Sequence, residues 1–570
     1  MMKRIITIVL GLVAVALPVA TEAQVAKHVE VTKAYVPEVA DAVKLPIEPN
    51  MVDTVKMRPE IDYSIVPTIY STSLSTHRFK PATVTYWEFN RPKNFYIKAG
   101  VGYPLNSVGD AYASVHRARV GYLLAYVNHH GEYDKRPNHN GKLTKAMQMQ
   151  NRVGAAGGVY CGKRIFEGDF NYNTENYHRF AGDGSEIDYE DVNLKLRFGD
   201  TFTDLSRTNF DVVLYGNYFN DKAGWLDKSN KRRLQQTHAG AKARVAREFK
   251  RHYLEAMAGY DGYWGFKDLT NYTDNMAYGG VRYGFRSELL SLLVGVDYCY
   301  DRVKGREKAS HYVLPTLKAS LNVSPRDIVT PFIEIESSVE NNSFHSLIQR
   351  NPYLEFTNRQ FSLPNTVNYD MRFGIEGRFA KDKFAYRLHA GMSFIENSIY
   401  WYNYDFMWLR PEADRRNVLS LNLEIDYRPI HSLELSAGVH GYIFNDFADI
   451  HLAGTKYSLA GGRSPFEANL KVRYDFGKVS VGAAANLYGK ALWSSIERID
   501  PEQAPEPANM EMRKFQTPFY ADLSVDLDWE VAKNCSIFVE GRNLANMKIY
   551  RWAYYRDMGV HFTAGARVNF

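Results

Sequence analysis

Apolar and polar residues alternate with a period of two in long segments between Phe95 and Phe570. In segment 466–476 (FEANLKVRYDF) every even position is apolar and every odd position is polar, and similar runs occupy 192–198, 419–427, 521–529 and 562–570. Such a strand has one apolar and one polar face. Lengths of about ten residues suit a tilted strand that crosses a hydrocarbon layer, whereas strands of soluble sandwiches are nearer five or six. The pattern predicts an all-β transmembrane antiparallel β-barrel.

The connections between the predicted strands are of two kinds. Strands that end near 116, 160, 198, 247, 285, 322, 379, 428, 476 and 530 precede brief turns, and a last strand ends at 570. Strands that start near 94, 119, 164, 209, 252, 292, 330, 383, 434, 479 and 534 mostly precede longer polar connections, such as 343–365, 446–465 and 489–517. The sequence thus predicts about 22 strands with short periplasmic turns and long extracellular loops. A soluble β-propeller is the alternative, but no repeated blade motif supports it.

The phase of the alternation assigns a face to each residue. Aromatic residues at the turn end of the apolar face are expected to form a periplasmic girdle at the membrane interface: Phe198, Phe285, Phe379, Tyr427, Phe476 and Trp529. Polar residues of the opposite face are expected to line the lumen: Asn422, Glu424, Asp426, Glu467, Lys471, Arg473, Asp475, Asp522, Asp526 and Asp528.

The first 92 residues have a different pattern. A basic opening, an apolar run over 5–20 and small residues before Gln24 indicate a secretory signal peptide at 1–23. Segment 24–92 has a proline every several residues, which excludes a long helix and predicts an extended periplasmic or lumenal segment. Its β-favouring piece Val29-Glu30-Val31-Thr32 is a candidate partner-binding strand. The barrel is expected over 93–570.

Composition narrows the chemistry. The formal net charge of +6 is a weak excess for 570 residues, and nothing in the sequence indicates a nucleic-acid partner. The three cysteines, Cys161, Cys299 and Cys535, exclude a four-cysteine zinc site. His129-His130 has no ligands at metal spacing, and His345-Ser346 is interpreted as a polar loop pair. We therefore predict no catalytic, cofactor or metal site and expect a protein that is not an enzyme.

The C-terminus resembles that of TonB-dependent receptors. The resemblance rests on the alternation from Tyr520, the turn at 532–534 and the phrase SIFVEGRNLAN at 536–546, followed by Tyr550 and Trp552. The final strand, with Phe562, Val568 and Phe570 on the lipid side, looks like the insertion signal that barrels present to the barrel-assembly machinery. The resemblance implies the outer membrane of a Gram-negative bacterium, with a Bacteroidota-like style, and a role in transport. The residues before the first predicted strand do not show the pattern expected of a full N-terminal plug domain.

Two functions remain open from the sequence. The first is solute or ligand passage across the outer membrane, and the second is a non-enzymatic scaffold or accessory subunit of an envelope-biogenesis complex with a periplasmic or outer-membrane partner. A lumen of about 22 strands needs closing. Candidates for closure are segment 24–92, a partner, and the long loops with Tyr353, Phe356, Phe361 and Trp493.

Overall fold

The computed structural model describes residues 94–117, 119–222, 233–324, 328–355, 363–445, 447–452, 455–500, 503 and 509–570. The chain divides into two compact units, Met1–Glu88 and Phe89–Phe570, and all described residues belong to the second. The predicted signal peptide, segment 24–92 and the strand Val29–Thr32 lie outside the described residues.

Twenty-four strands join one sheet, and 22 of them form a closed antiparallel barrel, while β24 and β25 lie in a loop. The barrel strands are β1 (Phe95–Tyr103), β2 (Asn106–Arg117), β3 (Gly121–Glu132), β6 (Gln148–Cys161), β7 (Arg164–His178), β8 (Glu186–Asp200), β9 (Asn209–Asp221), β10 (Leu234–Phe249), β11 (His252–Lys267), β12 (Thr273–Arg286), β13 (Leu290–Val303), β14 (Ser310–Leu321), β15 (Thr330–Glu340), β16 (Thr366–Phe379), β17 (Phe384–Tyr404), β18 (Trp408–Ile430), β19 (Leu433–Phe444), β22 (Phe466–Asp475), β23 (Val479–Tyr488), β26 (Tyr520–Ala532), β27 (Cys535–Arg542) and β30 (His561–Asn569).

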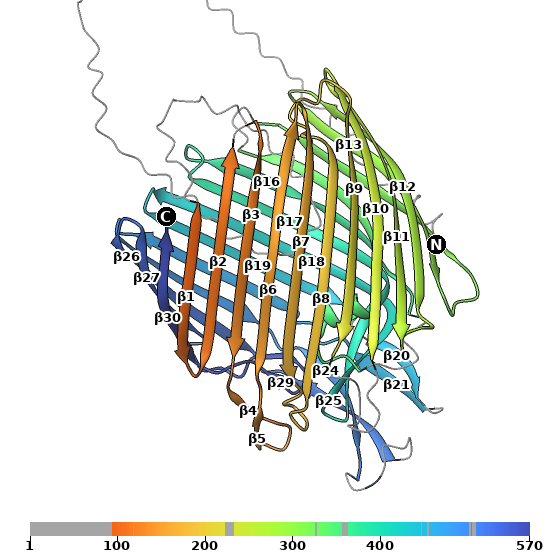
Figure 1. Ribbon diagram of the computed structural model, residues 1–570. Helices are drawn as coiled ribbons and strands as arrows, with labels where there is room; N and C mark the ends of the chain where they lie inside the picture. Colours follow the sequence, from red (N-terminus) through yellow and green to blue (C-terminus); the bar gives the residue numbers. More distant parts are fainter. Residues whose placement is uncertain are drawn as a thin grey trace, which may run out of the picture. The chain divides into compact units, whose positions relative to one another are not determined.

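The barrel closes between its first and last strands. β1 pairs with β2 on one side and with β30 on the other, and Figure 1 shows these strands side by side. The amide of Phe95 donates to the carbonyl of Phe570 at 2.8 Å, and the amide of Phe570 returns a bond at 3.0 Å. Their rings stack with centroids 5.3 Å apart. The predicted fold class and strand number are confirmed.

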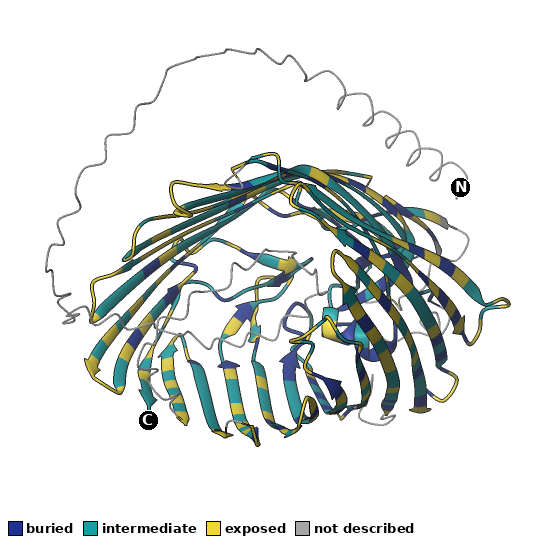
Figure 2. Ribbon diagram, turned by 90° about the horizontal axis from the view of Figure 1, so that it is seen from above, coloured by how far each residue is buried: buried dark blue, intermediate teal, exposed yellow. Residues whose placement is uncertain are grey.

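Burial alternates along the barrel strands. In β26 the odd-numbered Leu523, Leu527 and Trp529 are 37%, 37% and 47% exposed on the outer wall, while Asp526 and Asp528 point inward. The alternating bands of exposed and less exposed residues in Figure 2 repeat this pattern around the wall. Successive residues of a strand therefore lie on opposite sides of the wall.

The two ends of the barrel differ. We call the end with the short connections the turn end and the other the loop end. The strands differ in how far they extend at the loop end. β1, β27 and β30 have 9, 8 and 9 residues, whereas β17 and β18 have 21 and 23. The loops of this end contain further short strands: β4 (Lys135–Pro137), β5 (Leu143–Lys145), β20 (Phe447–Leu452), β21 (Thr455–Ala460), β24 (Leu492–Arg498), β25 (Met510–Gln516), β28 (Tyr550–Trp552) and β29 (Tyr555–Arg556).

One helix, α2 (Phe344–Arg350), lies in the connection between β15 and β16. The hydroxyl of Ser343 caps its N-terminus by accepting from the amide of Ser346 at 3.4 Å. Within the described parts of the chain, no helix has the length and apolar character needed to cross a membrane.

Candidate functional site

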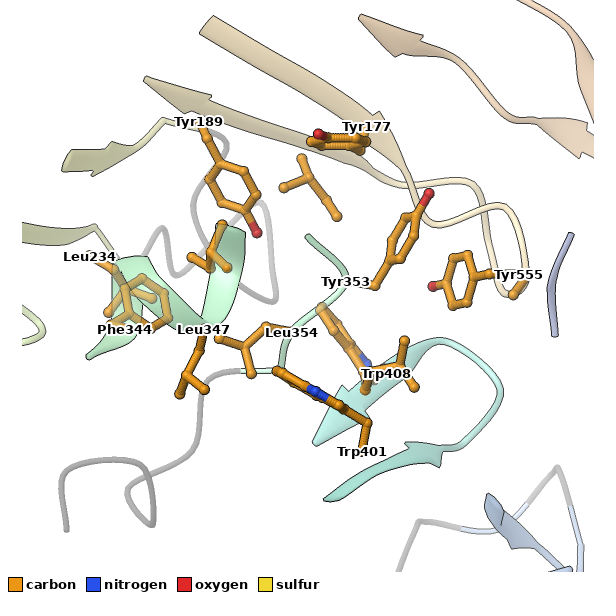
Figure 3. Close-up of a cluster of buried hydrophobic side chains, with 14 of the residues drawn as sticks. Tyr177, Tyr189, Leu234, Phe344, Leu347, Tyr353, Leu354, Trp401, Trp408 and Tyr555 are labelled. Carbon is orange, nitrogen blue, oxygen red and sulfur yellow. The ribbon is translucent and has the colours of Figure 1, made fainter. Parts of the chain in front are cut away.

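The loops of the loop end pack into a folded cap with its own hydrophobic core. We use the name loop cap for these connections and the strand ends that they contact. Its core holds residues from several loops and neighbouring strand ends: Ala146, Tyr177, Phe180, Ala181, Ile187, Tyr189, Phe219, Leu234, Leu269, Tyr272, Phe344, Leu347, Ile348, Tyr353, Leu354, Leu363, Trp401, Trp408, Leu409, Trp493, Ala553 and Tyr555. Segments far apart in sequence therefore enclose one water-excluding cluster at this end of the barrel (Figure 3).

Helix α2 attaches the cap to the inner wall. Its Phe344 and Leu347 are 3% and 0% exposed and belong to the same cluster as Phe219 of β9 and Leu234 of β10. The ring of His345 stacks on Phe219 with centroids 4.5 Å apart. Burial, with a smaller effect of the nearby His238, lowers the pKa of His345 to about 3, so this ring is neutral at physiological pH. The helix is thus fixed by apolar packing against the wall.

Aromatic side chains connect the helix region to the other loops. Tyr353 and Tyr555 stack with centroids 3.8 Å apart, and Phe180 meets Tyr555 edge to face at 5.1 Å. The guanidinium carbon of Arg179 lies 4.0 Å from the centre of the Trp408 ring. In Figure 3, Tyr353 and Tyr555 lie beside each other, although they come from different loops. Contacts of this kind join three loops into one packed layer.

Backbone hydrogen bonds add to this packing. The amide of Leu409 donates to the carbonyl of Tyr353 at 3.1 Å, and the amide of Glu355 donates to the carbonyl of Leu409 at 2.9 Å. The Arg410 guanidinium forms an ion pair with the Glu355 carboxylate. On the other side, Tyr189 donates its hydroxyl to the carbonyl of Pro352 at 2.9 Å. The connection after α2 is therefore held from both sides.

A cavity of about 510 Å³ lies between the inner wall and the loop cap. Its lining comes from β19, β22, β23, β26 and the adjoining loops: Tyr442, Phe444, Gly462, Arg463, Ser464, Glu467, Tyr488, Gly489, Ala491, Trp493, Thr517, Tyr520, Asp522, Ile549, Tyr550, Arg551 and Asp557. Gly462 has a φ of +68°, and a Cβ there would lie 2.4 Å from the Trp493 ring. Glycine is thus required where the chain crosses this indole.

Aromatic faces and charged groups share the cavity. The rings of Tyr488 and Tyr520 stack at 4.9 Å, and Asp522 accepts from the amide of Asn543 at 3.2 Å. In the loop, Arg551 and Asp557 form an ion pair at 3.2 Å. The Asp557 carboxylate raises the pKa of Arg551, whereas burial raises the pKa of Asp557 itself. The lining offers rings for stacking and hydrogen-bonding groups of both signs to a polar guest.

Elsewhere on the inner wall, charges are compensated between strands that are adjacent or one strand apart. Lys98 of β1 contacts Glu540 of β27 at 2.9 Å, and Arg282 of β12 bridges Glu255 and Asp297 at 3.0 and 2.9 Å. Further inner-wall pairs are Arg197–Glu167, Arg244–Asp211, Lys318–Glu336, Arg387–Glu334 and Arg567–Asp528. Much of the lumen charge is therefore matched by the barrel itself.

The residues predicted to line the lumen do not form one site. Glu467 and Asp522 line the cavity. Asn422 is buried and its amide oxygen lies 2.8 Å from Nδ1 of His440, whereas Asp528 pairs with Arg567 at 2.6 Å. The others lie along the polar faces of β18, β22 and β26: Glu424, Asp426, Lys471, Arg473, Asp475 and Asp526.

The predicted girdle residues, Val568 and Phe570 lie at the turn end, whereas Phe562 lies at the loop end, where it pairs with Tyr103 of β1. Phe198, Phe379, Tyr427, Phe476 and Trp529 are 41%, 42%, 37%, 67% and 47% exposed, and Phe285 is half-buried. In β30, Phe562 is 47% exposed, Val568 is partly buried, and Phe570, which follows the strand, is 55% exposed.

Two of the four loop aromatics that are candidates for closure belong to the cap core. Tyr353 and Trp493 are 4% and 5% exposed within the cap core, whereas Phe356 and Phe361 lie outside the described residues. The interpretation of His345-Ser346 as a polar loop pair is wrong for His345, because its ring is buried on Phe219. Sequence reasoning also missed Tyr177, Trp401 and Tyr555, although the aromatic run at 400–404 (YWYNY) was a visible signal.

Comparisons with known proteins place the fold. The copper transporter OprC is 13% identical, with 84% of this chain and 80% of that chain covered and a TM-score of 0.61. The FrpB iron transporter from Neisseria meningitidis (F3-3 variant) is 11% identical, with 85% of this chain and 82% of that chain covered and a TM-score of 0.63. The siderophore receptor PirA from Acinetobacter baumannii is 10% identical, with 84% of this chain and 80% of that chain covered and a TM-score of 0.62. The barrel resembles those of transporters and receptors.

No family model and no curated protein matches the chain. At identities of 10–13% the structural likeness establishes the fold alone.

Proposed function

We propose that this protein is an outer-membrane barrel of a Gram-negative bacterium, related to TonB-dependent receptors, that admits a solute through the cavity beneath the loop cap. The observation that carries the proposal is the cavity itself, which combines stacked tyrosines, an indole and charged groups inside a 22-strand barrel. Concave sites with rings and a few placed polar groups suit small ligands. The similar folds of OprC, FrpB and PirA, which are described as transporters and a receptor, support a transport role.

Planar-bilayer conductance tests this function. The packed cap predicts that the purified protein is silent without a ligand. The double variant Tyr353→Ala/Tyr555→Ala removes the central stack of the cap and should produce conductance, because its large side chains hold separate loops together. The matched double variant Tyr283→Ala/Tyr298→Ala, on the outer wall, should stay silent. Steady conductance of the unmodified protein would contradict a closed cap.

A scaffold is the second candidate, favoured by the inner-wall ion pairs that compensate lumen charge without any guest. Crosslinking in native membranes followed by purification distinguishes the two functions. A fixed set of periplasmic or outer-membrane partners together with a cavity that binds no solute would support the scaffold and contradict transport.

We also propose that Phe570 carries the signal for the barrel-assembly machinery, together with Phe562 and Val568 on the same face. Phe570→Asp should block membrane insertion. Phe95→Asp is the matched control, because Phe95 stacks on Phe570 and its variant leaves the C-terminal residue intact. A charge near the interface costs only about 0–1 kcal/mol, so a large defect confined to Phe570→Asp indicates recognition. Equal defects would indicate lost packing instead.

A further inference from the structure

Two neighbouring turns at the turn end carry four exposed cations. Arg117 and Arg119 lie at the turn between β2 and β3, and Lys163 and Arg164 lie at the turn between β6 and β7. The amide of Tyr160 donates to the carbonyl of Val120 at 2.9 Å, which places the two turns side by side. None of the four forms an ion pair with a described acidic side chain.

Three other turns at this end balance their charges. Between β8 and β9, Arg207 contacts the carboxylates of Asp200 and Asp204 at 3.8 and 4.0 Å. The turn between β22 and β23 contains one acid, Asp475, and one base, Lys478. Glu530 and Lys533 have the same balance between β26 and β27. The turns between β10 and β11, with Lys250 and Arg251, and between β16 and β17, with Lys381 and Lys383, are also positive. The feature of the β2–β3 and β6–β7 turns is that two positive turns lie next to each other.

The cations lie on the outer surface. The guanidinium carbon of Arg164 is 5.0 Å from the centre of the Phe210 ring and 6.0 Å from that of Phe198, which is 41% exposed on the outer wall. Arg117 continues the outward series of β2 that includes Val115, which is 51% exposed. These side chains thus border the apolar wall, where lipid headgroups lie, instead of the lumen.

An exposed apolar surface adjoins the cations. Val120, Leu123 and Val159 are 58%, 59% and 55% exposed, and Gly121 pairs with Val159 across β3 and β6. A molecule that fits both parts has an anionic head and an apolar tail. Arginine also matches the fork geometry of a phosphate group.

We propose that these turns bind an anionic phospholipid of the leaflet that borders the turn end. The phosphate lies between the two turns and contacts Arg119 and Lys163, while Arg117 and Arg164 border it on either side and add to its attraction. An acyl chain covers Val120 and Val159. This inference rests on the membrane placement given under the proposed function. A lipid fits better than an acidic soluble protein, because such a protein would have to displace lipid from the outer wall to reach Arg164.

The test is a lipid titration of the purified full chain followed by native mass spectrometry, with phosphatidylglycerol and with phosphatidylcholine of the same acyl chains. We expect tighter binding of phosphatidylglycerol. In Arg117→Gln/Lys163→Gln its affinity should fall roughly 20- to 30-fold, from about fivefold for each cation. The control Lys478→Gln/Lys533→Gln also removes two cations, from balanced turns elsewhere on the ring, and should change the affinity less than about twofold.

Cys161 offers a second measurement, because it is exposed in the turn that holds Lys163. A polarity-sensitive fluorophore on Cys161, in a Cys535→Ser background, should respond to phosphatidylglycerol and not to an acidic peptide. A response to the peptide alone would assign the cations to a protein partner and overturn the proposal. Equal binding of both lipids, or equal losses in the two double variants, would also overturn it.

Failure of the lipid site and failure of the membrane placement give different results. A barrel that inserts into bilayers but shows no preference for the anionic lipid contradicts only this site. A folded barrel that fails to enter bilayers contradicts the placement on which both proposals rest.

Discussion

The outer wall of the barrel and the loop cap use leucine in opposite ways. Leu421 of β18 is 61% exposed on the wall, whereas Leu347 of α2 is 0% exposed in the cap core. The apolar side chains of the wall are shielded from water only when hydrocarbon surrounds the barrel. Its backbone hydrogen bonds run between strands. The cap buries apolar side chains against one another, as a soluble protein does. One chain thus contains two cores that respond to different surroundings.

Removing a buried side chain from the cap should have the largest effect. Leu347→Ala leaves a cavity in the cap core, and such changes cost about 2–5 kcal/mol. Hydrogen–deuterium exchange of the amides of Leu347 and Asn351, which bond within α2, should speed up accordingly. The control Leu421→Ala removes the same atoms from the wall and should leave α2 unchanged. Unaltered exchange in Leu347→Ala would contradict a cap core centred on this helix.

Placing a charge on the wall should damage assembly and not the cap. Leu527→Lys puts an ammonium group against hydrocarbon between the girdle and the bilayer midplane, where the cost lies between about 0–1 and about 2–4 kcal/mol. Its neighbour Asp526→Lys places the same group on the inner face and should be tolerated. The folded fraction in membranes can be read from heat-modifiable mobility on gels. Similar fractions for both variants would show that the assigned strand phase is wrong, because one residue separates the two faces.

Acid should weaken the cap through His345. The ring stays neutral in the folded cap down to about pH 3, whereas in an unfolded loop it takes up a proton below the usual histidine pKa of 6.5. Cap stability is therefore complete above pH 6.5 and falls by about 1.4 kcal/mol for each pH unit below it.

Exchange of α2 amides at neutral pH and at about pH 5 measures this loss. His345→Asn keeps a polar planar side chain and should flatten the dependence on pH. An equally steep dependence in the variant would show that His345 is not its source.

The smallest effect is expected from a single hydrogen bond. Tyr353→Phe keeps the stack on Tyr555 but removes the hydroxyl that accepts from Gln148 at 3.2 Å. A typical loss is about 0.5–1.5 kcal/mol, seen as a small rise in cap exchange. Gln148→Met should give a similar value, and the double variant should add little to either. Full additivity would show that the two side chains do not act as a pair.

The contrast also explains how far the sequence could be interpreted. Strand bounds followed from local alternation, and the predicted end near 476 compares with Asp475 in the structure. A lipid-facing strand repeats every two residues, so its phase can be read from a few neighbours. The turns were predictable for the same reason, because they interrupt that phase.

The cap could not be read in this way. Its core joins Tyr177, Tyr353 and Tyr555, which are far apart in the chain and have no shared period. Tyr177 ends a regular strand, so its aromatic ring suggested nothing beyond that strand. His345 was misassigned because the burial that neutralises it comes from β9, more than a hundred residues away. Loop contacts of this kind depend on three-dimensional packing, which periodicity does not encode.

The pairing of Phe95 with Phe570 has a consequence for the order of events during biogenesis. The first barrel strand stays without its second neighbour until the last residue of the chain has been synthesised. Contacts of such long sequence separation fold slowly, and an open strand edge invites pairing with other chains. The ring therefore stays open until β30 is available to pair with β1. The time spent in that state, more than the strength of the finished seam, should limit the yield of this protein.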